Sequence, residues 1–589
     1  MTIAPTTTTP DASVAKDSKA NWRRDMDGKQ VTGAEMFVES LIREGVDLIF
    51  GYPGGVVLKV YDEIYKRRRE LHVIVPRHEQ AGGHAADAYS RVTGRVGTLF
   101  VTSGPGATNT VTALATAMMD SIPMVCFTGQ VSRELIGSDA FQETDAIGIT
   151  RPVVKHSYMI ESAEDIPRIV REAYYIARTG RPGPVLVDIP KNVTIETGIF
   201  QWPEEVSIRG YKPTFEGHPK SIQRLADAIA EAERPYLYVG GGVILSNASQ
   251  ELFELVEKTN IPVTTTLMAL GAFPGTHPLF VGMPGMHGSK VANICFQEAD
   301  LVISIGARFD DRVTGKLEAF APKAKIAHVD IDPSSIKKNV KVDYPVVGDA
   351  RWVLAELNKI VKPREPNGWN RLVADMKKTH WFKYRKDTSV VRPQYVLDMI
   401  YQMTKDRDTI ITTEVGQMQM WAAQFYLFDE PRRWLTSGGL GTMGYGLPAA
   451  VGAQLAAPDA LVIDIGGDSS TQMNIQEFAT IVQHNIPVKV ANINNGYMGM
   501  VRQWQELFYD RRYSASCMGQ IPNFERVAEA YGIKGITVRE HAEVIPAIEQ
   551  MISYPGPVFV DFWVNPEEKV YPMVPPGAAL HEMKDEEWA

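Results

Sequence analysis

Apolar and polar residues alternate along most of the 589-residue chain, with short apolar runs separated by longer amphipathic stretches. Runs such as Pro235–Val239 and Leu301–Ile305 predict buried strands, and Glu79–Thr93 has the residue spacing of a helix. Strands that alternate with helices are typical of parallel sheets with helices on both faces. The alternation starts afresh near residues 32, 235 and 392, so we expect an α/β protein with three doubly wound parallel-sheet domains.

Interruptions of this pattern suggest where the domains end. Residues 1–28 are polar and rich in Thr and Pro, which predicts a disordered tail. Irregular, Pro-bearing sequence separates the first two domains, and a charged, mainly helical stretch separates the second from the third. We therefore expect domains at 29–205, 220–358 and 392–568, a linker at 359–391 and a C-terminal tail at 569–589.

Composition narrows the functional classes. The net charge of −9 argues against nucleic acid as a main partner, and no apolar run approaches the ~18 residues that a membrane span needs. Cys126, Cys295 and Cys517 are far apart and fit no disulfide or zinc spacing, so we expect a reducing compartment and a cytoplasmic location. The polar N-terminal tail lacks the apolar stretch of a secretory signal.

Two polar residues follow neighbouring apolar runs near residues 463–500. Asp468 follows the apolar run at 463–465, and Asn495 follows the run at 488–493. Because ligands bind at the carboxyl ends of parallel strands, both side chains would reach one edge of the sheet. With the carbonyl of Tyr497 they would offer hard oxygen ligands to Mg²⁺. An isolated Gly-Asp pair would more often be a plain turn.

Glu79 is the second candidate. It stands at a strand-to-helix turn, where an acid usually just complements the helix N-terminus. Here it lies in sequence between two Gly-rich loops, 51–55 and 103–106, that allow close approach of other groups. Lys191 follows another apolar run, and it would either bind a carboxylate or be a solvated surface charge.

The second domain carries Gly, Arg and Asp residues at successive strand ends. Gly240, Gly241 and Gly242 follow its first strand but lack the GxGxxG spacing, which makes them a weak dinucleotide signal. The repeated pattern suits a large nucleotide lying along the sheet edge. The alternative is a set of surface turns.

The composite around Asp468 and Asn495 resembles the diphosphate-binding motif of thiamine diphosphate (ThDP) enzymes. Four segments resemble the large catalytic subunits of the acetohydroxyacid synthase (acetolactate synthase) family: RFDDRVTGK (308–316), DAFQET (139–144), QMWAAQF (419–425) and GMVRQW (499–504). The resemblance extends from about residue 32 to 576, and RFDDRVTGK separates the chain from pyruvate oxidase and oxalyl-CoA decarboxylase. It implies pyrimidine-binding, FAD-binding and diphosphate-binding domains, in that order.

The resemblance also implies an activity and its cofactors. Such enzymes decarboxylate pyruvate and transfer the two-carbon unit to pyruvate or 2-ketobutyrate, the first common step of branched-chain amino acid biosynthesis. ThDP and Mg²⁺ would serve the reaction, and FAD would be bound without redox turnover. The active site would lie between two subunits, so we expect a homodimer or homotetramer, with a small regulatory subunit as a further partner.

Individual roles follow from the resemblance by position. Glu79 would contact the aminopyrimidine ring, and Asp468, Asn495 and the Tyr497 carbonyl would hold Mg²⁺. The residues around ThDP would be Val415, Gly416, Gln417, Gly441, Met443, Ser469, Ser470, Gly499 and Met500. The substrate side would be lined by Gly55, Phe141, Gln142, Lys191, Arg312 and Trp504. FAD would contact Arg181, Gly240, Gly241, Gly242, Thr266, Leu267, Met268, Met286, His287, Arg308, Asp310, Asp330, Ile331 and Asp349.

Three residues depart from the family pattern. Met418 stands where many members have His, Ser469 replaces the second Gly of Gly-Asp-Gly, and Gly466 replaces an acidic or small residue. These departures bear on ThDP affinity more than on reaction type. Two alternatives stay open: another ThDP decarboxylase or oxidase, and, because of Met418 and Ser469, a catalytically silent binding or regulatory homologue.

Overall fold

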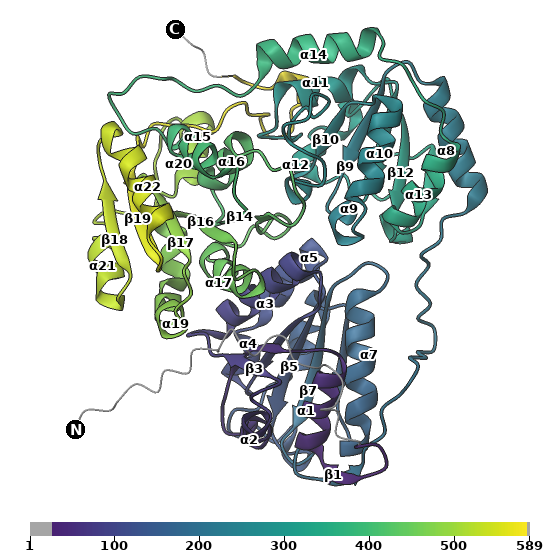
Figure 1. The fold of residues 1–589 in the computed structure, drawn as a ribbon, viewed down its shortest axis with the longest axis vertical. Helices are drawn as coiled ribbons and strands as arrows, with labels where there is room; N and C mark the ends of the chain where they lie inside the picture. The colour runs from purple at the N-terminus through teal and green to yellow at the C-terminus, as the bar shows by residue number, and fades with distance from the viewer. Residues whose placement is uncertain (1–25, 586–589) are drawn as a thin grey trace.

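The computed structural model describes residues 26–585 and contains three parallel sheets with helices on both faces (Figure 1). This confirms the expected fold class. Most of the tail predicted at 1–28 lies outside the described residues. No helix within 26–585 has the length and apolar character needed to cross a membrane. The domain boundaries given above stay predictions.

The N-terminal sheet has six parallel strands in the order β3-β2-β4-β5-β7-β6. Its strands are β2 (Leu48–Tyr52), β3 (His72–Ile74), β4 (Gly97–Val101), β5 (Met124–Gln130), β6 (His156–Met159) and β7 (Pro184–Pro190). Its helices include α1 (Gly33–Arg43), α2 (Leu58–Lys66), α3 (Glu79–Thr93), α4 (Pro105–Thr108), α5 (Val111–Asp120), α6 (Ala146–Thr150) and α7 (Ile166–Arg178). A short antiparallel pair, β1 (Gln30–Thr32) and β8 (Thr197–Ile199), closes the domain.

The central sheet has five parallel strands in the order β10-β9-β11-β12-β13. Its strands are β9 (Pro235–Val239), β10 (Val263–Thr265), β11 (Leu301–Ile305), β12 (Lys325–Asp330) and β13 (Tyr344–Val347). Its helices are α8 (Pro219–Glu231), α9 (Gly242–Leu245), α10 (Ser249–Thr259), α11 (Lys290–Glu298), α12 (Asp311–Thr314), α13 (Ala350–Ile360) and α14 (Gly368–His380). Although α14 falls in the expected linker, its buried Trp369 donates a hydrogen bond to the carbonyl of Pro235 at 3.0 Å, which fixes it to this domain.

The C-terminal sheet has the order β15-β14-β16-β17-β19-β18. Its strands are β14 (Thr409–Thr413), β15 (Trp434–Leu435), β16 (Leu461–Gly467), β17 (Lys489–Asn494), β18 (Lys534–Val538) and β19 (Val558–Trp563). Its helices are α15 (Pro393–Thr404), α16 (Gln417–Phe425), α17 (Gly446–Ala456), α18 (Asp468–Thr471), α19 (Phe478–Gln483), α20 (Gly499–Phe508), α21 (Phe524–Tyr531) and α22 (Val544–Ser553). Counted within each domain, the N- and C-terminal sheets have the same strand order, 2-1-3-4-6-5. This agrees with a faint internal repeat in the sequence, in which Thr436-Ser437-Gly438 matches Thr102-Ser103-Gly104.

The two outer domains meet through equivalent helices. In Figure 1, α3 and α17 lie side by side between the purple and green domains, and each follows the second strand of its own domain. The helices approach so closely that a Cβ atom at Gly452 would collide with the carbonyl oxygen of Ala85. The Tyr445 hydroxyl donates to Asp87 across this contact at 2.7 Å. The carboxyl edges of the two sheets are therefore held in a fixed relation within one chain.

Two stretches with helical spacing in the sequence, 107–119 and 473–484, are interrupted in the structure. The stretch 107–119 is divided between α4 and α5, because the amide of Thr110 bonds back to Ala107 in a tighter turn. The stretch 473–484 begins as a 3₁₀ segment and turns α-helical only at Phe478. Asn474 leaves helical geometry there, and its side chain donates to the carbonyl of Gly444 at 2.6 Å.

Candidate functional site

One large cavity, of about 570 Å³, lies where the three domains meet. The N-terminal domain contributes the end of α5 and Arg181, and the central domain contributes the carboxyl ends of its strands. The C-terminal domain contributes residues from the loops after β14 and β15 and from helix α20. Carboxyl ends of parallel strands are the usual ligand-binding edge of such sheets.

Every residue predicted to contact FAD lines this cavity. They are Arg181, Gly240, Gly241, Gly242, Thr266, Leu267, Met268, Met286, His287, Arg308, Asp310, Asp330, Ile331 and Asp349. Two of the acids also cap helices: Asp310 accepts from the amide of Arg312 at 3.0 Å, and Asp349 from the amide of Arg351 at 3.0 Å. Burial lowers the pKa of His287 to about 4, so this ring is neutral near pH 7.

The ThDP set is divided between the cavity wall and the sheet edge beside it. Five of its members line the cavity: Val415, Gly416, Gly441, Met443 and Met500. The other four, Gln417, Ser469, Ser470 and Gly499, do not. Gln417 accepts from the Asn495 amide at 3.1 Å, which places it against one of the predicted metal ligands.

Asp468 is the first residue of α18, directly after β16, and only 3% of it is exposed. Its Oδ2 atom has no hydrogen-bond partner among the described residues. Burial raises the pKa of this carboxyl to about 7. An orphaned, buried carboxylate oxygen is costly unless something pairs with it, and a divalent cation would do so. The residue chemistry therefore fits the predicted Mg²⁺ site.

Asn495 and Tyr497 stand at the end of the next strand, β17. The side-chain oxygen of Asn495 accepts from the amide of Tyr497 at 3.1 Å, which sets the turn that carries both residues. Within residues 26–585 no cluster of three or more His, Cys, Asp or Glu side chains could hold a metal. A cation bound through one carboxylate, one amide and a carbonyl would therefore need further oxygen ligands, as a diphosphate supplies.

Met418 occupies the space beneath the Asp468 turn. Its methyl group lies 2.5 Å from where a Cβ atom at Gly467 would be, and its sulfur is 3.0 Å from the equivalent position at Gly416. The buried thioether thus fills this place with an apolar group. Nearby Ser469 has a hydroxyl without a partner among residues 26–585, which leaves it free for an oxygen-rich ligand.

Glu79 is the first residue of α3 at the N-terminal edge, and it is 9% exposed. Asn109, in the turn between α4 and α5, donates to its Oε2 atom at 2.9 Å. The C-terminal domain also contacts the turn that precedes Glu79, since buried Glu477 accepts a hydrogen bond from the amide of Arg77 at 2.8 Å. Glu79 does not line the large cavity.

The predicted substrate residues form two separate groups. Arg312 and Trp504 line the cavity, and Trp504 also packs edge-on against Phe508 at 5.6 Å. Gly55, Phe141, Gln142 and Lys191 belong to the N-terminal domain and do not line it. Phe141 is 89% exposed, and Gly55 and Lys191 are exposed as well. One chain therefore does not bring the two groups into one site.

Several polar groups near the site were missed by the sequence reasoning. Glu414, directly after β14, is fully buried and accepts from the amide of Gly444 at 2.6 Å, next to Met443. Burial raises its pKa to about 7. Asp120, at the end of α5, and Ser437 to Gly439 also line the cavity. The sequence offers one indication of the loop at 437–439, because Thr436-Ser437-Gly438 repeats the residues Thr102-Ser103-Gly104 of the N-terminal domain.

Comparison with protein families gives three separate matches along the chain. Residues 31–149 match the N-terminal TPP binding domain of thiamine pyrophosphate enzymes, residues 222–357 match their central domain, and residues 414–562 match their C-terminal TPP binding domain. Thiamine pyrophosphate is the older name of ThDP. Each match falls within one of the three parallel-sheet domains.

Individual proteins are similar along almost the whole chain. The acetolactate synthase isozyme 3 large subunit of Escherichia coli is 47% identical over 94% of this chain and 98% of its own. The acetolactate synthase large subunit of Buchnera aphidicola is also 47% identical, with the same two shares covered. The acetolactate synthase of Mycobacterium bovis is 49% identical over 94% of this chain and 92% of its own. The chain belongs to the thiamine pyrophosphate enzymes, within the family of acetolactate synthase large subunits.

Proposed function

We propose that this chain is the catalytic subunit of an acetolactate synthase, which decarboxylates pyruvate and transfers the two-carbon unit to pyruvate or 2-ketobutyrate. The observation that carries the proposal is the identity of 47–49% to acetolactate synthases over 94% of this chain. The family models matched by the chain include the stretches around Glu79 and Asp468. The reaction would open branched-chain amino acid biosynthesis.

ThDP would supply the carbanion and the electron sink for this chemistry. Asp468, Asn495 and the Tyr497 carbonyl would hold its Mg²⁺, in keeping with the unpaired Oδ2 of Asp468. Glu79 would exchange a proton with the aminopyrimidine ring, and Asn109 would orient its carboxyl group through Oε2. The glycine and methionine residues of the loops after β14 and β15 would shape the cofactor pocket without donating or removing protons.

FAD would occupy the part of the cavity lined by the central domain. The lining combines the glycine loop after β9, buried apolar side chains, and charged groups such as Arg308 and Asp310, which pair at 3.2 Å. A long nucleotide with an apolar ring and a charged diphosphate suits this mixture. Because no step of the proposed reaction transfers electrons to or from a flavin, we assign FAD a structural role.

A second copy of the chain would complete the active site, as a homodimer or a homotetramer. In support, Glu79, Gly55, Phe141, Gln142 and Lys191 lie outside the cavity of their own chain. The side chains of Leu135, Ile136 and Phe141, close together in the sequence, are apolar and exposed. Apolar surface of this kind is stabilised when a partner covers it.

We also propose a small regulatory subunit as partner, because similar proteins are named large subunits. The three cysteines are unpaired within residues 26–585, in keeping with the cytoplasmic location expected from the sequence. We keep the domain boundaries predicted from the sequence, 29–205, 220–358 and 392–568, as part of this proposal.

A single assay tests the reaction. Pyruvate is incubated with the purified protein, Mg²⁺, ThDP and FAD, and each component is then omitted in turn. Formation of 2-acetolactate that requires all of them supports the proposal. Acetaldehyde or acetyl phosphate as the product would instead identify another ThDP decarboxylase or an oxidase, and no product with all components present would indicate a catalytically silent homologue.

A further inference from the structure

The loop at 436–443, between β15 and α17, forms a wall of the large cavity. Ser437, Gly438, Gly439, Gly441 and Met443 all line it. The C-terminal domain holds the start of the loop through two contacts. The hydroxyls of Thr413 and Thr436 are 2.7 Å apart, and Gln419 donates to the Thr436 hydroxyl at 2.7 Å.

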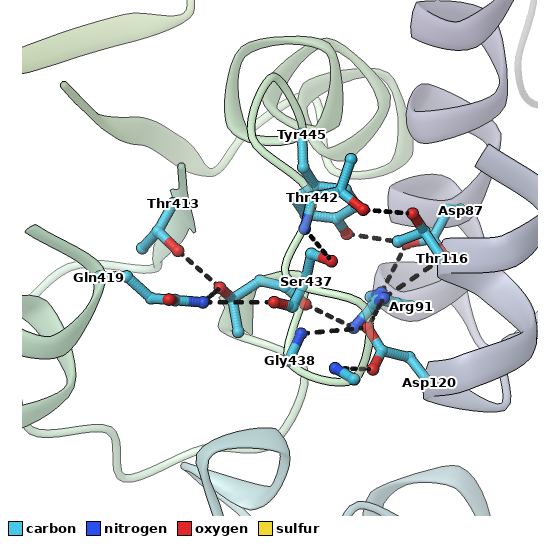
Figure 2. A network of polar contacts seen from close by, with 12 residues as sticks. Asp87, Arg91, Thr116, Asp120, Thr413, Gln419, Ser437, Gly438, Thr442 and Tyr445 are labelled. Carbon is cyan, nitrogen blue, oxygen red and sulfur yellow. Dashed lines mark hydrogen bonds and ion pairs between the residues drawn. The ribbon is translucent and has the colours of Figure 1, made fainter. Parts of the chain in front are cut away.

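The N-terminal domain holds the same loop from the opposite side through Asp120 (Figure 2). Its Oδ1 atom accepts from the amide of Gly439 at 2.7 Å, and its Oδ2 atom accepts from the amide of Gly438 at 3.3 Å. Only 1% of the Asp120 side chain is exposed. One carboxylate thus fixes two successive backbone amides of a loop that lies 318 residues further along the chain.

Arg91 of α3 extends this contact. Its Nη2 atom donates to Asp120 at 2.8 Å, its Nη1 atom to the carbonyl of Thr436 at 3.1 Å, and its Nε atom to Asp87 at 2.6 Å. Asp87 in turn accepts from the hydroxyl of Tyr445, just beyond the loop. Figure 2 shows Asp87, Arg91 and Asp120 reaching toward the green loop from the purple helices. Because the groups are buried, each depends on its partners for stabilisation.

The loop has little room to move. A Cβ atom at Gly439 would lie 2.8 Å from Asp120 Oδ1, and one at Gly438 would collide with the sulfur of Met268. Met268 belongs to the side of the cavity assigned to FAD, whereas Gly441 and Met443 belong to the ThDP set. The loop is therefore fixed between the N-terminal and central domains at the point where the two cofactor regions adjoin.

We propose that Asp120, supported by Arg91, is a positioning residue that holds loop 436–443 in the shape required to bind ThDP. This inference rests on the proposed function, since it concerns the same cofactor. Asp120 acts through the loop backbone. The groups that hydrogen-bond to its carboxylate are all donors: the amides of Gly438 and Gly439 and the guanidinium of Arg91.

The test is Asp120→Asn, because an amide of the same size must turn its NH₂ group toward one of these donors. Hydrogen exchange of the cofactor-free protein is measured by mass spectrometry, and ThDP binding by calorimetry in the presence of Mg²⁺ and FAD. We expect exchange of the peptide containing residues 436–443 to accelerate about tenfold, and ThDP affinity to fall about tenfold, as loss of a charge-assisted hydrogen bond implies.

Tyr174→Phe is the matched control, since it removes a buried hydroxyl contact of 2.6 Å with Thr98 inside the N-terminal domain. It should alter neither readout beyond twofold. Should Asp120→Asn fail to fold, Thr116→Val replaces it, because it removes the 2.7 Å contact of Thr116 with the Thr442 hydroxyl of the loop. Its only other hydroxyl contact among the described residues is a bond to the Thr112 carbonyl within the same helix. The same two changes are expected there, each at least threefold.

Wild-type exchange at 436–443 together with wild-type ThDP affinity in the variant would overturn the inference. So would equal losses in Tyr174→Phe, which would show that general stability is responsible. A wild-type protein that binds no ThDP would reject the proposed function itself, and this outcome is distinct from a variant that matches a ThDP-binding wild type.

Discussion

The N-terminal and C-terminal domains have the same strand order and pack through equivalent helices, yet their carboxyl edges carry different chemistry. At the N-terminal edge, the acid Glu79 follows the second strand of the domain and accepts from Asn109. At the C-terminal edge, the acid Asp468 follows the third strand and has an oxygen without a partner among residues 26–585. Each acid begins a helix, but Glu79 has a side-chain donor, whereas Oδ2 of Asp468 has no partner among the described residues.

The difference shows that the repeated sheet determines where functional residues stand, at its carboxyl edge. The loops determine which chemical groups are present there. Near Asp468 the loop residues offer oxygens and small side chains, as a metal-bound diphosphate requires. Near Glu79 they offer an amide donor and closely packed glycines, which suit a neutral ring. Function therefore belongs to the residues placed on the fold, even where the fold is duplicated inside one chain.

The strongest expected effect comes from removing the acid of the C-terminal edge. Asp468→Ala should abolish Mg²⁺-dependent ThDP binding, because the cation loses its only carboxylate ligand there. Calorimetric titration with ThDP measures this. Asp459→Ala, which removes an exposed acid of the same domain, is the control. Unchanged affinity in Asp468→Ala would mean that the metal is held elsewhere.

The acid of the N-terminal edge should behave differently. Glu79→Gln keeps an oxygen for Asn109 but loses the ionisable proton, so folding and FAD binding should survive. The rate should fall about 10²–10⁴-fold, the usual range for acid-base catalysis. Steady-state rates, with the flavin spectrum as the check on folding, decide the matter. Near-normal turnover would remove the proposed contrast between the two edges.

A third experiment addresses the contact between Glu477 of the C-terminal domain and the amide of Arg77 of the N-terminal domain. Burial raises the pKa of Glu477 from 4.5 to about 7. The folded state therefore binds a proton that the unfolded state releases between these values, and stability falls as pH rises through this window. The loss is roughly 3 kcal/mol, since one pKa unit corresponds to about 1.4 kcal/mol.

Glu477→Gln should lack this loss. We expect the thermal midpoint of the variant, relative to wild type, to be several degrees higher at pH 8 than at pH 5. Differential scanning at both pH values measures the gap. The same gap at both would show that Glu477 is ionised throughout, with its charge compensated by the backbone of Arg77.

Local sequence pattern was sufficient for much of the fold. The strands Pro235–Val239 and Leu301–Ile305 and the helix Glu79–Thr93 have the predicted bounds, because each is an apolar or amphipathic segment with a clear start and stop. The set of residues assigned to FAD by resemblance also shares one cavity. The roles of those residues stay predictions.

Contacts between distant segments could not be predicted in this way. The interruptions near Asn109 and Asn474 occur where side chains bond to other segments instead of continuing a helix, Asn109 to Glu79 and Asn474 to Gly444. The hydrogen bond from the amide of Gly439 to Asp120 joins residues that are 319 apart in the sequence. No periodicity within either segment encodes such a pair, because each is locally an ordinary helix end or glycine turn.

The smallest expected effect concerns the choice of the second substrate, to which both domains are proposed to contribute. Pyruvate and 2-ketobutyrate differ by one methylene, so polar groups such as Arg312 and Lys191 cannot separate them. Discrimination must come from apolar contact, worth roughly 1–3 kcal/mol. Trp504 lines the cavity and also packs on Phe508, so it is placed for either substrate contact or simple packing.

Trp504→Leu and Phe508→Leu separate the two roles, because Phe508 is the packing partner but does not line the cavity. If Trp504 reads the methylene, its variant should keep acetolactate formation while the preference for 2-ketobutyrate falls about tenfold. Phe508→Leu should keep the wild-type product ratio. If the only role of Trp504 is to pack against Phe508, both variants should lose formation of both products together with thermal stability. Product ratios from a mixture of the two ketoacids distinguish these outcomes, and a wild-type ratio in an active Trp504→Leu would leave substrate choice to the N-terminal edge.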